Sequence, residues 1–155
     1  MRTVEQWLTE YGESHQHETN KTLHWICVPA IVVSLIGLLW SIPVPDAVRD
    51  LSPLANWGTL VLALGVLYYL RMSFSLALGM LAFVILVTLA ILGLQNLPWP
   101  LWTVCLTIFV VAWIGQFIGH HYEGKRPSFF KDLQFLMIGP LWLMSFVYRK
   151  LRIPY

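Results

Sequence analysis

Four long apolar stretches dominate the sequence and restrict the chain to folds that bury them or expose them to lipid. They are Leu23–Ile42, Trp57–Leu70, Phe74–Leu94 and Trp99–Ile118. An α-helix needs about 20 apolar residues to cross the hydrocarbon core of a bilayer. Only 12% of the residues are charged, about half the roughly 25% of a soluble domain. The sequence predicts an all-α, multi-pass membrane helical bundle with four spans, forming a single membrane domain over residues 1–155.

A fifth apolar run, Leu133–Val147, is shorter and is interrupted by Gly139 and Pro140. As a helix it would reach about 22 Å at 1.5 Å per residue, against ~30 Å of hydrocarbon. We therefore expect a re-entrant segment that turns back at Pro140, or a segment that lies in the membrane interface, in place of a fifth span.

The N-terminal segment has the pattern of a short amphipathic helix. Thr3 and Gln6 have the spacing of a capping box, in which each residue bonds to the backbone N–H of the other. Apolar side chains then recur at helical spacing, at Val4, Trp7, Leu8 and Tyr11. This pattern predicts a helix that lies on the membrane surface.

The distribution of basic residues predicts the orientation of the spans. With four spans and the N-terminus inside, the outer side holds only Arg49. The inner side holds Arg2, Lys21, Arg71, Lys125, Arg126 and Lys131. Cytoplasmic loops carry such an excess, so the N-terminus is expected in the cytoplasm. Three more basic residues after the fifth run also stay inside if that run does not cross. No basic stripe suggests a nucleic acid partner.

The histidines form two groups at the ends of apolar stretches. His15, His17 and His24 accompany the start of the first stretch, and His120 and His121 follow the fourth. The predicted topology places both groups on the cytoplasmic face at the same depth. Neutral histidine is the commonest metal ligand, so this gathering predicts a shared metal site. The alternative is that single histidines occupy the interface or the core for structural reasons.

Helical spacing indicates which side chains could meet at such a site. A straight helix would place His15 and His24 on opposite sides, so we expect a break around residues 16–19, with Thr19 capping a second helix. Tyr11 shares a helix face with His15. At the other group, His121 points about 100° away from its neighbour. The polar side chains available to support imidazoles are Glu18, Asn20, Gln116 and Glu123, and Glu123 could also be an oxygen ligand.

Gly115 and Gly119 form a G-x-x-x-G pair in the fourth stretch. Small residues at this spacing allow two helix backbones to approach closely. The pair therefore predicts close helix packing at this point and no chemical role.

Two segments resemble the motifs of a known family. The segment "YGESHQHETNKTLHWICVP" contains Tyr-x3-His followed by Asn and then His four residues on. The segment "QFIGHHYEGKRPSFFKDLQFLMIGPLW" contains Gln-x2-Gly-His followed by Glu and Pro. Over nearly its whole length the chain resembles the small membrane 2-hydroxy fatty acid dioxygenases, whose fungal member acts in phytosphingosine breakdown at the endoplasmic reticulum.

The resemblance implies an Fe²⁺-dependent α-oxidation, in which a 2-hydroxy fatty acid and O₂ give a fatty acid one carbon shorter. It implies that His15, His24 and His120 are the iron ligands. Glu123 or His17 would be a fourth ligand, and the part of His121 stays open. The other matching positions, with catalytic or orienting roles, are Tyr11, Asn20, Gln116 and Glu123.

The resemblance also sets the expected surroundings. The acyl tail would lie between the spans, and Lys21, Lys125 or Arg126 would meet the carboxylate at the surface. The partners are then the 2-hydroxy fatty acid, O₂ and membrane lipid, in a bacterial inner membrane or, in a eukaryote, the endoplasmic reticulum. The oligomeric state is open.

Two other functions are compatible with the same residues. Two histidines on different helices could hold a haem axially, which would make the chain a haem- or metal-binding membrane redox carrier. The chain could also be a structural membrane protein without catalysis.

Overall fold

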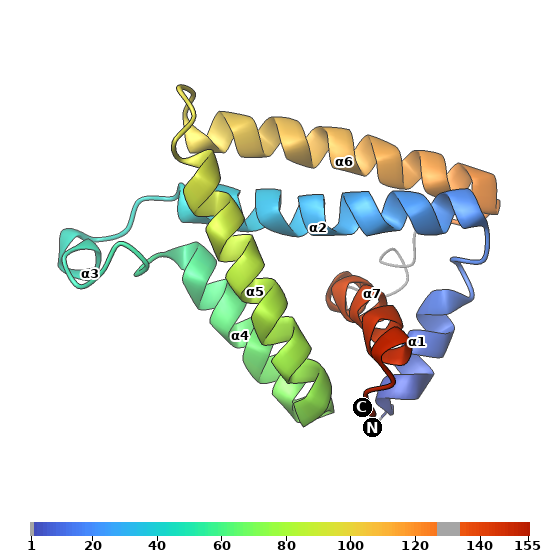
Figure 1. The fold of residues 1–155 in the computed structure, drawn as a ribbon. Helices are drawn as coiled ribbons and strands as arrows, with labels where there is room; N and C mark the ends of the chain where they lie inside the picture. The colour runs from blue at the N-terminus through green and yellow to red at the C-terminus, as the bar shows by residue number, and fades with distance from the viewer. Residues whose placement is uncertain (1, 127–133) are drawn as a thin grey trace.

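The structure is a computed structural model of the 155-residue chain, and it describes residues 2–126 and 134–155. Every regular element among these residues is an α-helix (Figure 1). The helices are α1 (Val4–Gly12), α2 (Glu18–Trp40), α3 (Asp46–Arg49), α4 (Trp57–Met72), α5 (Phe74–Leu94), α6 (Leu101–Glu123) and α7 (Phe135–Leu151). The predicted all-helical class is confirmed.

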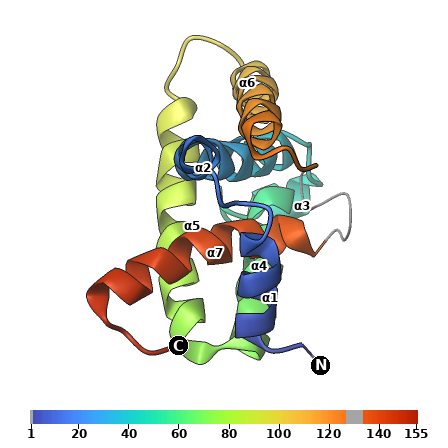
Figure 2. The same cartoon turned by 90° about the vertical axis from the view of Figure 1, so that its right-hand side faces the viewer.

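Helices α2 and α6 form an antiparallel pair that runs the length of the molecule (Figure 1), and Figure 2 views this pair nearly end-on. Small residues allow the two backbones to approach. A Cβ atom on Gly115 would lie 2.6 Å from Cys27 Sγ, and one on Gly37 would overlap Cys105 Sγ. The close packing predicted at Gly115 is therefore present, and Gly37 adds a second close approach at the other end of the pair.

Helices α4 and α5 form a hairpin that crosses α2 obliquely (Figure 1). Ser73 ends α4 and also caps α5, because its hydroxyl accepts a hydrogen bond from the backbone N–H of Leu76 at 3.3 Å. The hairpin meets α2 in a small apolar cluster of Ile36, Leu62, Val87 and Ile91.

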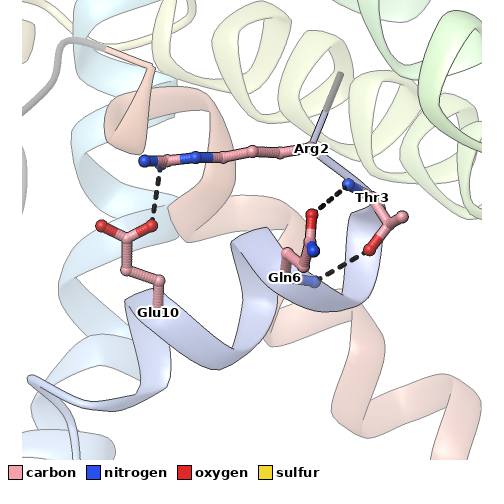
Figure 3. A network of polar contacts seen from close by, with 4 residues as sticks. All are labelled: Arg2, Thr3, Gln6 and Glu10. Carbon is pink, nitrogen blue, oxygen red and sulfur yellow. Dashed lines mark hydrogen bonds and ion pairs between the residues drawn. The ribbon is translucent and has the colours of Figure 1, made fainter.

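The predicted N-terminal helix, α1, begins with the capping box (Figure 3). Thr3 Oγ1 accepts the backbone N–H of Gln6 at 3.2 Å, and Gln6 Oε1 accepts the backbone N–H of Thr3 at 2.9 Å. Arg2 spans the helix to pair with Glu10 at 2.8 Å. These contacts fix the first turn of α1.

The apolar side of α1 faces the protein, and the position of this helix at the membrane surface stays a prediction. Trp7, Leu8 and Tyr11 are buried, and the Trp7 ring meets the Phe135 ring of α7 edge-on, with 5.5 Å between centroids. Helix α7 has an apolar face of its own, which includes Ile138. Two apolar faces of one chain exclude water by packing together.

The fifth apolar run forms one continuous helix, α7, so the chain does not turn back at Pro140. Proline removes one helical hydrogen bond, and contacts with other helices hold the segment. Tyr69 Oη donates to the carbonyl of Met137 at 2.8 Å, and Tyr148 Oη donates to the carbonyl of Ser75 at 2.6 Å. Leu133, where the predicted run starts, lies outside the described residues.

Three helices, α2, α5 and α6, are long and apolar enough to cross a membrane, with mean hydropathies of 2.1, 2.7 and 2.0. Helix α4 is apolar but has 16 residues. Large apolar side chains are exposed along α5 and α6, namely Leu78, Leu81, Ile85, Leu86, Leu89, Leu106, Val110, Val111, Ile114, Phe117 and Ile118. This surface is compatible with a membrane protein. The count of four spans stays a prediction.

Replacing Gly37 by Ala should destabilise the α2–α6 pair by about 1–3 kcal/mol, because the added methyl group overlaps Cys105 Sγ. The free energy of unfolding in detergent micelles measures this. Gly93→Ala is the matched control, since its Cβ meets nothing within 4 Å. The double variant Gly37→Ala/Cys105→Ala removes the sulfur and should recover most of the loss. Equal stability of Gly37→Ala and Gly93→Ala would contradict the close packing.

Candidate metal centre

Three histidines from distant parts of the chain meet at one end of the α2–α6 pair. His15 lies in the connection between α1 and α2, His24 in α2, and His120 near the end of α6. They are 1%, 1% and 4% exposed. One ligand nitrogen of each lies within 4.8 Å of the other two. These are the three residues that the sequence predicts as ligands, and the fold brings them together.

A break between the first two helices turns His15 back over His24. Helix α1 ends at Gly12 and α2 begins at Glu18, so the predicted break is present. The cap of α2 lies two residues before the predicted Thr19. It is His17, whose Nδ1 accepts the backbone N–H of Thr19 at 3.2 Å. An imidazole nitrogen can take the place of a hydroxyl oxygen in this role.

Backbone carbonyls fix the tautomers of two of the imidazoles. His15 Nδ1 lies 2.6 Å from the Tyr11 carbonyl oxygen, and His24 Nδ1 lies 2.9 Å from that of Asn20. A carbonyl oxygen only accepts hydrogen bonds, so each Nδ1 carries the hydrogen and donates it. In the neutral ring, each Nε2 then carries a lone pair and no hydrogen.

The two Nε2 atoms face each other at 2.8 Å. Two lone pairs at this distance repel, and a cation in contact with both removes the repulsion. Ligand atoms bound at ~2.1 Å to one ion, at right angles, lie about 3 Å apart. Metal-bound histidines commonly donate their second nitrogen to a backbone carbonyl, which is the arrangement of His15 and His24. The spacing and the tautomers both fit a bound metal ion.

A shared proton fits the same contact less well. Burial, together with the neighbouring His24 and despite the Tyr11 carbonyl, lowers the pKa of His15 to about 3, so the ring is neutral at physiological pH. The Tyr11 ring stacks on it, with 4.2 Å between centroids and 8° between planes. Burial also raises the pKa of the Tyr11 phenol, which therefore stays protonated.

His120 supplies the third nitrogen. Its ring centroid lies 4.9 Å from that of His15 and 5.2 Å from that of His24. Its Nδ1 is buried and has no hydrogen-bond partner among the described residues. A buried nitrogen without a partner is costly, and a metal ion would satisfy it. Three imidazole nitrogens suit iron, zinc, copper or nickel.

Glu123 joins the two ends of the site. Its carboxylate accepts hydrogen bonds from the backbone N–H groups of Gln16 and His17, both at 2.8 Å, and from Asn20 Nδ2 at 3.1 Å. It therefore holds the α1–α2 connection against the end of α6, and the group of three histidines that could hold a metal ion does not include it.

The remaining polar residues lie around the histidine group. His17 is exposed, and its ring stacks on that of Tyr122. His121 is also exposed, and its ring meets the Tyr122 ring edge-on. Glu18 is also exposed. Lys125 Nζ donates to the carbonyl of Glu13 at 2.7 Å. The structure does not bring these side chains to the three histidines.

Asn20 is fully buried between the two motifs. Its Nδ2 also donates to the carbonyl of Ser14 at 3.1 Å, while its Oδ1 has no partner among the described residues. A Cβ atom on Gly119 would lie 2.5 Å from that oxygen. Glycine at this position therefore makes room for Asn20, which supports His24 through its backbone carbonyl.

A small cavity of about 60 Å³ adjoins the histidines. Its polar lining comes from Tyr11, His24, Gln116 and His120. Its apolar lining consists of Val28, Ile31, Val32, Trp113, Phe135, Leu136, Gly139 and Pro140. The sequence did not predict that α7 forms part of this lining, because its apolar run is also typical of a membrane segment. Trp142 of α7, whose ring lies 5.2 Å from that of His15, was missed for the same reason.

Comparison with known protein families identifies the family to which the chain belongs. A family model described as 2-hydroxy-palmitic acid dioxygenase Mpo1-like matches residues 1–151. The chain belongs to the Mpo1-like family. No curated protein and no solved structure gave a match. Membership confirms the resemblance carried by the two histidine motifs, and the description of the Mpo1-like family suggests a dioxygenase of 2-hydroxy fatty acids.

The metal-free Mpo1-like chain should lose stability as the pH falls below about 6.5. The unfolded chain binds a proton at His15 near its ordinary pKa of 6.5, whereas the folded chain binds it only near about 3. Between these values His15 contributes a slope of about 1.4 kcal/mol per pH unit, with the folded state less stable at lower pH. Unfolding titrations from pH 7 to pH 4 measure it, and His15→Gln should flatten the slope. An identical slope in both proteins would contradict a buried, neutral His15.

Proposed function

We propose that the protein is an Fe²⁺-dependent dioxygenase that converts 2-hydroxy fatty acids and O₂ to fatty acids one carbon shorter. The observation that carries the proposal is the pair of facing Nε2 atoms of His15 and His24, close to His120, whose Nδ1 has no hydrogen-bond partner among the described residues. The cavity next to these atoms has an apolar wall suited to the first carbons of an acyl chain.

The reaction balances without any further reductant. A 2-hydroxy acid and O₂ give the shortened acid, CO₂ and water, as the bond between C1 and C2 breaks. C2 changes from an alcohol to a carboxyl carbon and C1 becomes CO₂, a loss of four electrons that O₂ accepts. Iron would supply the redox-active centre that lets O₂ react with such a substrate, and its open positions would take the carboxylate and hydroxyl groups.

The chain's own residues would position the imidazoles and exclude water from the site. The carbonyl groups of Tyr11 and Asn20 hold the imidazoles of His15 and His24 in the tautomer that exposes Nε2. Burial of all three histidines keeps bulk water from the ion. Tyr11 and Gln116 line the cavity as hydrogen-bonding groups that can face a bound substrate.

The volume of the cavity limits what it can enclose. About 60 Å³ holds roughly four water-sized groups, enough for the hydroxyl and carboxyl groups and little of the chain. The rest of the acyl tail would extend along apolar side chains into lipid. A substrate that enters from the bilayer suits this arrangement.

We also propose the orientation in the membrane. Helices α2, α4, α5 and α6 would span it, α4 with local thinning of the bilayer because it is short, and α7 would lie near the interface. The basic residues then put the N-terminus and both histidine groups on the cytoplasmic side, in a bacterial inner membrane or, in a eukaryote, the endoplasmic reticulum. Lys131, one of the inner basic residues, lies outside the described part of the chain.

Metal analysis with a product assay tests the function. Wild-type protein purified in detergent and loaded with Fe²⁺ under argon should retain iron and, on exposure to O₂, convert 2-hydroxypalmitic acid to the C15 acid. His24→Ala and His120→Ala should each lose at least about 100-fold in iron affinity, more than loss of a supporting residue costs, and should lose the product. His121→Ala is the matched control, because it changes the exposed neighbour of His120 on the same helix.

The same preparation separates the rival functions. A haem-based redox carrier would show a strong Soret band, whereas the proposed protein binds iron and lacks that band. A structural protein would show equal iron content in wild type, His24→Ala and His120→Ala. That result would remove the proposed site.

A further inference from the structure

Gln116 carries a buried amide group that no hydrogen bond within the described residues uses. It lies one helical turn before His120 on α6, is 5% exposed, and lines the cavity beside the histidines. Its Nε2 is buried and has no partner in the part of the chain that the structure describes. A buried donor without a partner is costly, and a ligand in the cavity that Gln116 lines would satisfy it.

The cavity lacks any charged side chain among its described lining residues. Lys125, the basic residue nearest to the motif in sequence, is bonded to the Glu13 carbonyl. A carboxylate that enters this space loses its water and needs charge compensation and N–H or O–H donors. A metal ion at the histidines would supply charge to one carboxylate oxygen, which leaves the second oxygen in need of a donor.

We propose that Gln116 recognises the substrate's carboxylate, donating a hydrogen bond from Nε2 to the oxygen that the metal does not hold. This inference rests on the proposed function and adds the residue that selects acids over uncharged 2-hydroxy lipids. Gln116 is a substrate-binding residue in this scheme and takes no part in holding the metal. Tyr11 also lines the cavity. A hydrogen bond from a neutral donor such as the Gln116 amide is stronger to a carboxylate than to the oxygen of an uncharged amide, and this difference favours the acid.

Binding under argon tests the proposal without turnover. The proteins are the wild type, Gln116→Glu and Gln116→Met, each loaded with Fe²⁺ in the same detergent. The ligands are 2-hydroxypalmitic acid and 2-hydroxypalmitamide, which have the same tail and hydroxyl group. The ratio of their dissociation constants is compared between proteins, so that partition into micelles cancels. Iron content is measured in each sample.

Gln116→Glu should invert the selectivity, because its carboxylate repels an acid and accepts a hydrogen bond from an amide N–H group. We expect the acid-to-amide preference to fall by about 100-fold or more relative to wild type. Gln116→Met keeps the length of the side chain and removes the donor, and it should weaken acid binding by about 10- to 100-fold. Both variants should retain wild-type iron content.

Unchanged acid affinity in Gln116→Met would overturn the proposal, as would an unchanged acid-to-amide ratio in an iron-loaded Gln116→Glu. Loss of iron from Gln116→Met would also overturn it, because the residue would then support the metal site. If Gln116→Glu does not fold, the Met variant decides the question. Failure of wild-type protein to bind iron or either ligand would instead remove the proposed function.

Discussion

Two lone pairs that face each other across 2.8 Å are the constraint on which the rest of the structure depends. The tautomers that create them are set by backbone carbonyls, one at the end of α1 and one in the first turn of α2. The break between those helices exists to turn His15 back over His24. Glu123 fastens that break to α6 and so keeps His120 within reach.

The close packing of α2 against α6 determines whether the third histidine can join the other two. Gly37, Gly115 and Gly119 each leave room that a methyl group would fill, so the backbones stay close from one end of the pair to the other. Only the last of these contacts touches a residue of the site, through Asn20. The arrangement of the three histidines thus depends on an apolar interface that extends well beyond them.

Local patterns in the sequence predicted local structure well. Helical spacing predicted that Tyr11 and His15 share a face, and their rings stack in the structure. The Thr3–Gln6 capping box starts α1 as expected. Apart from the meeting of His15, His24 and His120, contacts between distant segments escaped prediction, because spacing within one helix carries no information about which face another helix covers. The packing of the apolar side of α1 on α7 is one such contact. Another is that of Glu123, which the sequence offers as an oxygen ligand and whose carboxylate accepts backbone N–H groups from residues 16 and 17.

His120 follows His24 by 96 residues, and this separation has a consequence for biogenesis. His15 and His24 leave the ribosome early, but their partner on α6 and the Glu123 carboxylate are synthesised only after the α4–α5 hairpin. Contacts of such long sequence separation form late in folding. A complete group of three histidines can therefore assemble only after α6 has been synthesised, and a prematurely terminated chain would carry two of the three.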